Sequence, residues 1–423
     1  MSVSVRLKDE RRSTTTRTAA LDILECGIEA IDPQKAIREA VAVSGEAVTI
    51  LGREYFGPVY LFGVGKCSHS AASELENILG ERVKGGVVID IVPGALSRTT
   101  YFMGDHPMPS EKNVKAAREL LSLAKKVPED ALAIVIVSGG GSTLLCDPKE
   151  PMTCTSEAVL LKELFKKGAT IQEINILRKH LSEIRGGGLA TVLNSRVEAL
   201  VISDVPGNSL ESIASGPTVL DRTTIEDARA ILQKYELSDA VPSVALMETP
   251  KEEALFQGVH TSLLLSNKDA LRAMSDRART LGFSSRIMSD TMIGEARVVG
   301  EDIVARLHKE PPKSVLLWGG ETTVTINGSG KGGRNRELAM GALLDLREGE
   351  LVGAIASDGI DNGSAAGGIS DILTARYASE IGFDSEEYLL RNDSESFFGR
   401  IGDALITGPT GTNVSDLIIA IKE

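Results

Sequence analysis

The sequence has few aromatic residues, few cysteines, an excess of negative over positive charge and no long apolar run. Aromatic residues make up only 4% of the 423 residues, so a core has to be built mainly from Ala, Val, Ile and Leu. The four cysteines, at positions 26, 67, 146 and 154, form no C-x-x-C pair and lack zinc-ligand spacing, which favours reduced thiols. The net charge of −13 argues against broad binding to nucleic acid or to a membrane surface, because both need clustered Lys and Arg.

Two further absences bear on location. No apolar run approaches the roughly 18–20 residues that span a bilayer. Met1 to Arg17 is polar and charged without an apolar core, so no signal peptide is predicted. We therefore expect a cytoplasmic protein that binds neither membrane nor nucleic acid, and its length indicates two or three domains.

What is present is an alternation of short apolar runs with longer amphipathic ones. A helix is expected over Ser110–Lys126 and another over Thr170–Glu183, where Thr170 and Glu173 form a capping-box pattern. Such alternation predicts parallel sheets covered on both faces. The expected strands are Val59–Phe62, Gly86–Val92, Leu132–Val137, Ala199–Ile202, Thr261–Leu265, Ser314–Trp318, Thr323–Ile326, Val352–Ala356, Asp403–Ile406 and Leu417–Ile421.

Five of the expected strands run directly into loops of small or polar residues. Ligands of open α/β sheets bind beyond the carboxyl ends of the strands, so these loops together predict a ligand site. A single glycine-rich loop would be weak evidence, because ordinary turns use the same residues. The loops are 63–68 (GVGKCS), 138–142 (SGGGS), 203–207 (SDVPG), 319–322 (GGET) and 357–361 (SDGID).

The first loop is neither a P-loop nor a good dinucleotide fingerprint. Tyr60 and Cys67 stand where a Walker A motif needs Gly and Ser or Thr, and Ser68 stands where a third Gly belongs. What remains is a strand, a backbone nest and Lys66 at a helix start, an arrangement that favours a bound anion. A solvated surface lysine is the competing interpretation.

Cations, carboxylates and hydroxyls near the other loops also fit an anionic ligand and a metal. Arg178, Lys179 and Arg185 could hold phosphates, or could simply offset the helix dipole. Arg334, which follows Gly332 and Gly333, suits a carboxylate or phosphate, because its guanidinium can donate two parallel hydrogen bonds to such a group. Asp204, Glu321, Asp358 and Asp361 could hold Mg²⁺ or cap helices, and 407–413 (TGPTGTN) offers hydroxyls and an amide.

In their order along the chain these motifs resemble the glycerate 2-kinases that carry a C-terminal MOFRL domain. The resemblance covers roughly residues 17 to 421, and one local departure is 361–363 (DNG), where Asp-Gly is expected. Besides the five loops, the matching motifs are 106–109 (HPMP), 214–218 (ASGPT), 332–337 (GGRNRE) and 407–413.

The resemblance implies an α/β fold of two domains with the active site in the cleft between them. The expected division is an N-terminal extension over 1–16, a larger Rossmann-like domain with a mostly parallel sheet over 17–250, and a smaller α/β domain over 251–423 that includes a MOFRL region at 312–421. It also implies transfer of the γ-phosphoryl of ATP to the 2-hydroxyl of D-glycerate with Mg²⁺, by a monomer or homodimer.

The resemblance and the loop chemistry together assign candidate roles. Lys66 and Arg334 are the expected catalytic residues, and Asp204, Glu321 and Asp358 the expected Mg²⁺ ligands. Arg334, Asn335, Thr412 and Asn413 are expected to bind the substrate. The residues expected to bind ATP are Gly63, Gly65, Ser138, Gly139, Gly140, Gly141, Ser142, Lys179 and Arg185.

Two other functions remain open at this point. An NAD(P)-dependent hydroxypyruvate reductase would use Gly63 and Gly65 for the pyrophosphate and Asp90 for the ribose, but the third Gly is missing. A non-catalytic regulator that binds sugar phosphates would gain nothing from the carboxylates at the strand ends.

Overall fold

The chain forms two compact units in the computed structural model, which describes residues 3–9 and 13–423. The central unit is Pro33–Leu264, and the terminal unit combines the N-terminal segment up to Asp32 with Leu265–Glu423. The expected boundaries after residues 16 and 250 differ from this division. Residues 17–32 belong to the terminal unit, and the central unit extends to Leu264. The first helix, α1 (Thr15–Ala30), therefore packs with elements from the other end of the sequence.

The central unit is built on a six-stranded sheet with the order β10-β9-β8-β5-β6-β7. The pairs that join β7 to β6, β6 to β5, β5 to β8 and β8 to β9 are all parallel, as the sequence predicts. The bounds are β5 (Val59–Val64), β6 (Val83–Asp90), β7 (Thr100–Met103), β8 (Leu132–Ser138), β9 (Arg196–Ile202) and β10 (Val259–Leu265).

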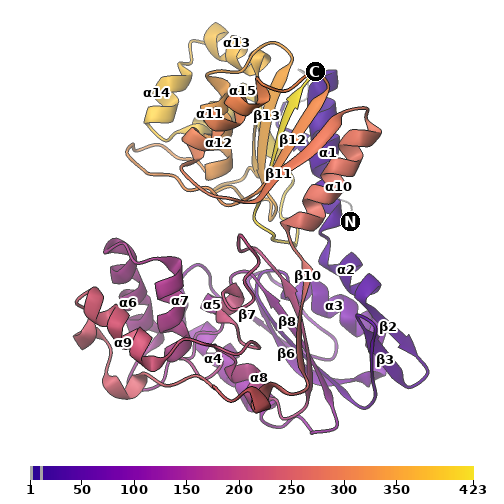
Figure 1. Ribbon diagram of the computed structural model, residues 1–423, viewed down its shortest axis with the longest axis vertical. Coiled ribbons are helices and arrows are strands. Elements are labelled where there is room, and N and C mark those ends of the chain that lie inside the picture. The colour runs from indigo at the N-terminus through magenta and orange to yellow at the C-terminus, as the bar shows by residue number, and fades with distance from the viewer. Residues whose placement is uncertain (1–2, 10–12) are drawn as a thin grey trace. The chain divides into compact units, whose positions relative to one another are not determined.

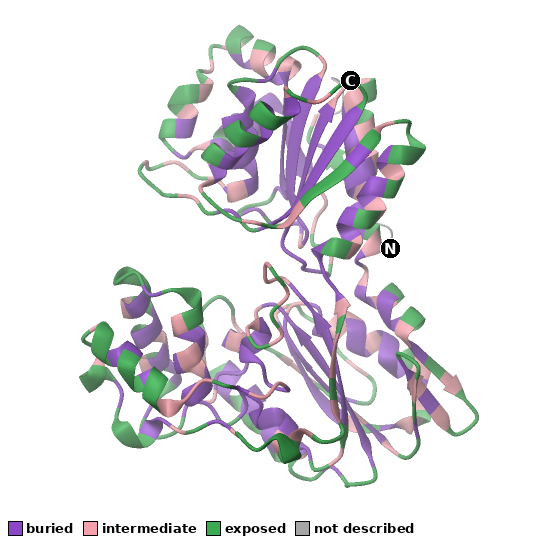
Figure 2. Ribbon diagram, viewed as in Figure 1, coloured by how far each residue is buried: buried purple, intermediate pink, exposed green. Residues whose placement is uncertain are grey.

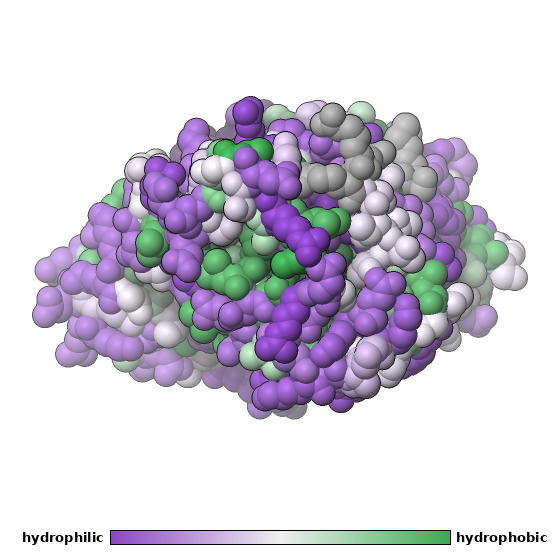
Figure 3. Space-filling model, turned by 90° about the horizontal axis from the view of Figure 1, so that it is seen from above, coloured by the Kyte–Doolittle hydropathy of each residue, from purple (hydrophilic) through white to green (hydrophobic). Residues whose placement is uncertain are grey.

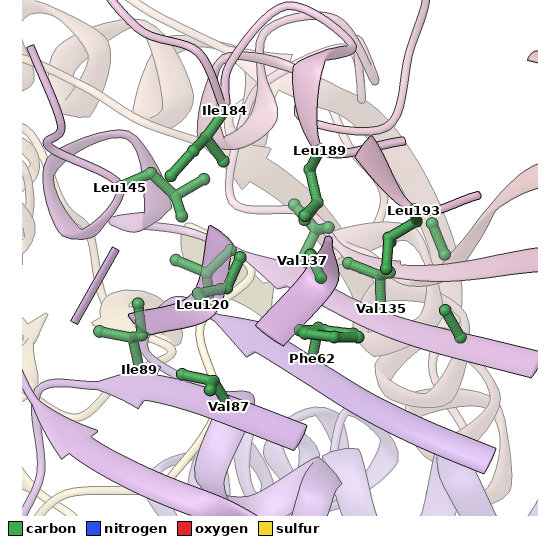
Figure 4. Close-up of a cluster of buried hydrophobic side chains, with 14 of the residues drawn as sticks. Phe62, Val87, Ile89, Leu120, Val135, Val137, Leu145, Ile184, Leu189 and Leu193 are labelled. Atoms are coloured by element: carbon green, nitrogen blue, oxygen red, sulfur yellow. The ribbon is translucent and has the colours of Figure 1, made fainter. Parts of the chain in front are cut away.

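Apolar side chains cover both faces of this sheet. All seven residues of β8 are buried, as expected for a strand inside a doubly covered parallel sheet. Phe62 packs on one face with Leu120 of α4 (Glu111–Ala124), as Figure 4 shows. Leu61 packs on the other face with Leu75 of α3 (Ser68–Leu79), because successive residues of a strand point to opposite faces.

The central unit carries two additions to the sheet. A three-stranded antiparallel sheet, β2 (Val41–Ser44), β3 (Ala47–Ile50) and β4 (Arg53–Tyr55), follows α2 (Pro33–Ala40). A helical lobe of α6 (Cys154–Lys166), α7 (Ile171–His180) and α9 (Ile225–Lys234) has its own apolar core (Figure 1). Short helices α5 (Gly141–Leu144) and α8 (Gly188–Val192) follow β8 and precede β9.

The terminal unit contains a seven-stranded sheet with the order β1-β15-β14-β13-β16-β12-β11. The β11–β12 pair is parallel, and every other pair in this order is antiparallel, so the expectation of a parallel sheet is wrong here. Continuous apolar runs predict burial on both faces, and they carry no information on strand direction. The bounds are β1 (Arg6–Leu7), β11 (Ser284–Met292), β12 (Ser314–Gly320), β13 (Glu350–Ala356), β14 (Gly367–Asp371), β15 (Ala404–Ile406) and β16 (Asp416–Lys422).

Helices cover both faces of this sheet as well. Helices α11 (Ala296–Leu307) and α12 (Arg334–Leu343) pack on one face, and α1 with α10 (Asn267–Thr280) on the other (Figure 1). Helices α13 (Ile372–Glu380), α14 (Ser385–Leu390) and α15 (Ser394–Ile401) enclose a smaller core around Phe397 and Phe398. The view from above shows a mainly hydrophilic surface with small apolar patches (Figure 3).

One expected strand is absent from the described part of the chain. Residues 323–326 form only an isolated bridge between Thr323 and Glu295. Ile326 is 75% exposed, so its apolar character does not mark a core position.

Candidate functional site

Three of the loops singled out in the sequence lie side by side in the central unit. They follow β5, β8 and β9, which are neighbours in the sheet. The Lys66 backbone N–H donates to the Gly139 carbonyl at 2.9 Å, and the Cys67 N–H donates to Ser138 Oγ at 3.2 Å. The backbone itself therefore joins the loop after β5 to the loop after β8.

Glycine is required where these loops approach one another. Gly65 has a φ of 118°, and a Cβ there would lie 2.2 Å from Ser138 Oγ. A Cβ on Gly139 would lie 1.8 Å from Asp204 Oδ2, so the Asp204 carboxylate rests directly on the bare backbone of the loop. A Cβ on Gly140 would come within 3.4 Å of both the His106 ring and Lys66 Cγ. The glycines thus let Lys66, His106 and Asp204 converge on one loop.

A cavity of about 440 Å³ opens beside this loop. Gly140, Ser142, Asp204 and His106 line it, and most of its remaining lining comes from α6, α7 and residues 107–109. Sequence reasoning singled out the loop but missed the cavity, because the lining on the two helices has no motif. Ser142 Oγ is held 2.8 Å from Ser215 Oγ, which in turn contacts Asn175 of α7.

Two cations that we expected to bind ATP have buried carboxylate partners. Lys179 Nζ lies 3.0 Å from Asp221, and Arg185 Nη1 lies 2.8 Å from Glu157. Arg185 is 1% exposed and also donates to the Ser142 carbonyl at 2.7 Å. These side chains anchor the helical lobe and the loop after β8, and neither lines the cavity.

Asp90, the residue that a reductase would use for ribose, is engaged by backbone. It is buried, and it accepts hydrogen bonds from the N–H groups of His69 at 2.9 Å and Ile91 at 2.6 Å. Burial raises the pKa of Asp90, although these donors oppose that shift. The Asp90 carboxylate thus binds the His69 N–H in the first turn of α3. This is the helix start at which the sequence suggested a site for an external anion.

In the terminal unit, Arg334 is held by two carboxylates. Its Nε and Nη2 donate to the two oxygens of Asp416 at 2.6 and 3.0 Å, and its Nη1 lies 2.9 Å from Glu321 Oε1. Burial raises the pKa of Asp416 to about 6, even though the Arg334 charge acts in the opposite direction. Asp416 was missed in the sequence, because it begins β16 rather than following a strand.

Asp361 caps the helix that Arg334 begins. Its two carboxylate oxygens accept the N–H groups of Asn335 and Arg336, each at 3.0 Å. This is the helix-capping role that the sequence left open for one of the acidic residues. The capped backbone holds Arg334 at the first position of α12.

The remaining candidates of the terminal unit lie in neighbouring loops. Thr412 is buried and donates to the Ile31 carbonyl at 2.8 Å, and Asn413 is buried beside it. Asp358 accepts the Ile360 N–H at 3.0 Å. The loop of Asp358 is tied to the loop of Thr412, because the Val414 N–H donates to Ser357 Oγ at 2.8 Å.

The expected Mg²⁺ ligands are divided between the two units. Asp204 belongs to the central unit, whereas Glu321 and Asp358 belong to the terminal unit. Within residues 3–9 and 13–423, no group of three or more His, Cys, Asp or Glu side chains could hold a metal on its own. Mg²⁺ usually takes one or two carboxylates plus phosphate oxygens and waters, so Asp204 at the edge of the cavity has suitable chemistry.

Two family matches cover most of the chain. The family described as "Domain of unknown function (DUF4147)" matches residues 19–247, and the MOFRL family matches residues 314–416. The chain is thus an α/β protein that combines a DUF4147 domain with a MOFRL domain.

Similar proteins and structures narrow this class. The chain is 39% identical to a glycerate 2-kinase of Pyrococcus horikoshii over 95% of its length and 98% of that protein, and 36% identical to a D-glycerate 2-kinase of Thermotoga maritima over 95% and 97%. The crystal structure of a glycerate kinase from Thermotoga maritima matches with a TM-score of 0.86 at 34% identity, covering 97% of this chain and all of that one. The chain belongs to the glycerate kinase family.

One relative carries a different name. A protein of Agrobacterium vitis with a provisional hydroxypyruvate reductase name is 33% identical over 93% of this chain and 92% of its own length. Among the described residues, no helix is both long and apolar enough to cross a membrane.

Proposed function

We propose that this chain is an ATP-dependent glycerate 2-kinase that converts D-glycerate and ATP into 2-phosphoglycerate and ADP. The observation that carries the proposal is the convergence of Lys66, the Gly139–Ser142 loop and Asp204 beside a cavity, in a chain of the glycerate kinase family. Bare backbone, a cation and a carboxylate at one sheet edge are what phosphoryl transfer needs, since its catalysis is mostly positioning and charge stabilisation.

The proposed reaction is a displacement at phosphorus. The 2-hydroxyl oxygen of glycerate forms a bond to the γ-phosphorus, and the bond to the β–γ bridging oxygen breaks, so ADP leaves. The hydroxyl proton passes to a carboxylate of the strand-end loops. Negative charge spreads over the oxygens of the transferred group during this step, and cations near those oxygens stabilise it.

We assign Lys66 to that charge stabilisation in the central unit. Its backbone N–H is tied to Gly139, which positions the side chain over the Gly140 loop. Gly63 and Gly65, with the Ser138–Ser142 loop, would admit the phosphates closely. Mg²⁺, when bound, supplies further neutralisation of the phosphate oxygens, and Asp204 is the residue of this unit that would hold it.

We assign Arg334 to the glycerate carboxylate or to the transferred phosphoryl. Asp416 grips one edge of the guanidinium in a bidentate pair, which fixes its plane. Glu321 contacts Nη1 and is the partner that an incoming anion would replace. Asn335, Thr412 and Asn413 lie in the neighbouring loops of this unit and remain proposed substrate contacts. The cleft between domains that the resemblance implies stays a prediction.

The reductase alternative lacks the residues that it requires. Asp90 is buried, and its two carboxylate oxygens accept backbone N–H groups of His69 and Ile91. Ser68 replaces the third Gly of a dinucleotide loop. A regulator that only binds sugar phosphates would show no ATP turnover with any hydroxy acid. A cytoplasmic location and a monomeric or dimeric state are further parts of the proposal.

Two substitutions test the assigned roles. We expect Lys66→Ala and Arg334→Ala to fold normally and to lose about 100-fold or more in kcat, as expected when charge stabilisation in the transition state is removed. The measurement is ADP release from ATP with D-glycerate in a coupled assay, with circular dichroism as the check on folding. Matched controls are Lys125→Ala and Arg376→Ala, which remove exposed cations from the same two units. A near-native kcat in either active-site variant contradicts its role.

A further inference from the structure

Apolar and polar residues both line the cavity beside the Gly139–Ser142 loop. Phe165 and Leu161 of α6, together with Met108, are among the apolar residues of this lining. Gly140 and Ser142 belong to the loop itself, and Asp204 lies against it. A pocket of several hundred Å³ with mostly apolar walls and a few polar groups is typical of a site for a small organic molecule.

One face of α7 lines the cavity and reaches the loop after β8. Ile171, Asn175 and Arg178 are spaced at i, i+4 and i+7, so they lie on one face of the helix, and all three line the cavity. Asn175 accepts a hydrogen bond from Ser215, which also contacts Ser142, and the Arg178 carbonyl accepts from Arg185, which also binds the Ser142 carbonyl. The Arg178 end of the face is therefore the end beside the loop.

Arg178 differs from the other cations nearby. Among the residues described, the buried Nε atoms of Arg178 and Arg185 both have no hydrogen-bond acceptor. Arg185 is nevertheless paired with the buried Glu157 through Nη1, and Lys179 is paired with the buried Asp221. Burial, followed by the nearby charge of Arg185, lowers the pKa of Arg178 to about 10, so the side chain is still charged at neutral pH. A buried N–H group without an acceptor is costly, and an anionic ligand in the cavity that accepts from Arg178 Nε would remove that cost.

We infer that this cavity binds the nucleoside phosphate portion of ATP, with the purine against the apolar wall and Arg178 bound to a phosphate oxygen. The inference rests on the proposed kinase function and assigns its nucleotide subsite. Glycerate is small and polar throughout, so it would leave the apolar wall empty. A nucleotide matches both kinds of lining, because its base is flat and weakly polar and its phosphates are anionic.

The test is ADP binding to the full-length chain by titration calorimetry, together with kinetics in both substrates. Loss of a hydrogen bond to a charged group corresponds to roughly ten- to hundredfold in affinity, so we expect Arg178→Met to weaken ADP binding and raise KM for ATP by that factor. KM for D-glycerate should stay within about twofold, and Arg178→Lys, which keeps the charge, should recover part of the loss.

A second pair of variants tests the apolar wall without disturbing the core. Phe165 and Val159 lie on α6 and are 55% and 57% exposed, but only Phe165 lines the cavity. We expect Phe165→Ser to weaken the binding of both ADP and adenosine, Val159→Ser to change neither, and Arg178→Met to weaken ADP far more than adenosine.

Three outcomes would overturn the inference. The first is an unchanged ADP affinity in both Arg178→Met and Phe165→Ser. The second is a change of KM for D-glycerate alone in Arg178→Met. The third is an equal change of ADP affinity in Phe165→Ser and Val159→Ser. If Arg178→Met does not fold, the ADP affinities of Arg178→Lys and Phe165→Ser test the inference instead. If the wild-type chain binds ADP in this Arg178-dependent way but phosphorylates no glycerate, the proposed function fails while the nucleotide subsite stands.

Discussion

At the scale of single residues, three cations close together in the sequence have different surroundings. Arg178 and Lys179 lie in the last turn of α7, and Arg185 follows that helix. By residue type each of the three could hold a phosphate. The structure pairs Lys179 with Asp221 and Arg185 with Glu157, and places Arg178 at the cavity. The sequence could not separate them, because their partners lie on α6 and on the chain after β9, far away in sequence.

Arg185 provides a stability prediction. Removing one partner of a buried ion pair leaves an uncompensated charge and costs roughly 3–5 kcal/mol. We expect Arg185→Met to lower the free energy of unfolding by about that amount, because Glu157 would remain buried without its ion-pair partner. Urea unfolding followed by circular dichroism measures it. The matched control is Arg229→Met, whose ion pair with Glu226 is exposed. An unchanged free energy of unfolding with a raised KM for ATP would instead support the expected nucleotide-binding role of Arg185.

At the scale of helices and strands, the sequence predicts that an element exists better than it predicts the direction of a strand or its neighbours in the sheet. The expected helix Thr170–Glu183 is confirmed as α7, and Thr170 and Glu173 form its capping box. Five of the six strands of the central sheet are found where expected, since continuous apolar runs leave few alternatives. The edge strand β7 was not expected, and none of its residues is buried. The antiparallel β16 between β12 and β13 was not predictable, because strand order depends on contacts distant in sequence.

The link between the starts of α12 and β16 provides a pH prediction. Asp416 is ionised above its pKa of about 6, a value raised by burial, and it then holds Arg334 in place. As the pH falls through this value, Asp416 becomes neutral and the ion pair is lost. We therefore expect kcat/KM for D-glycerate to fall on the acid side with an apparent pKa near 6. Asp416→Asn should give low activity without this acid limb, and an unchanged acid limb in that variant would contradict the assignment.

At the scale of the whole molecule, the two units are built from the chain in different ways. The central unit is one continuous stretch, whereas the terminal unit takes its first strand and first helix from the N-terminus. Arg17 of α1 is fully buried, with Asp371 at 2.6 Å and Asp403 at 2.9 Å. The expected N-terminal extension ended at residue 16, because nothing near Arg17 in sequence reveals these partners.

The loops of the candidate site could be predicted from the sequence, since parallel strands bring their carboxyl ends to one edge of a sheet. The cavity and Asp416 could not be predicted, and neither could the difference between Arg178 and its neighbours Lys179 and Arg185, because these features depend on burial and on partners contributed by other elements. Sequence motifs thus indicated the loops and the candidate charged residues, and the packing showed which of the three cations have buried carboxylate partners.

The most direct test of the central claim is phosphorus NMR of the product formed from D-glycerate, ATP and Mg²⁺ by the wild-type chain. The account predicts a new phosphomonoester signal split into a doublet by the single proton on C2, with ADP formed in equal amount. A triplet from the two protons on C3, or no phosphorylated glycerate at all, would contradict it.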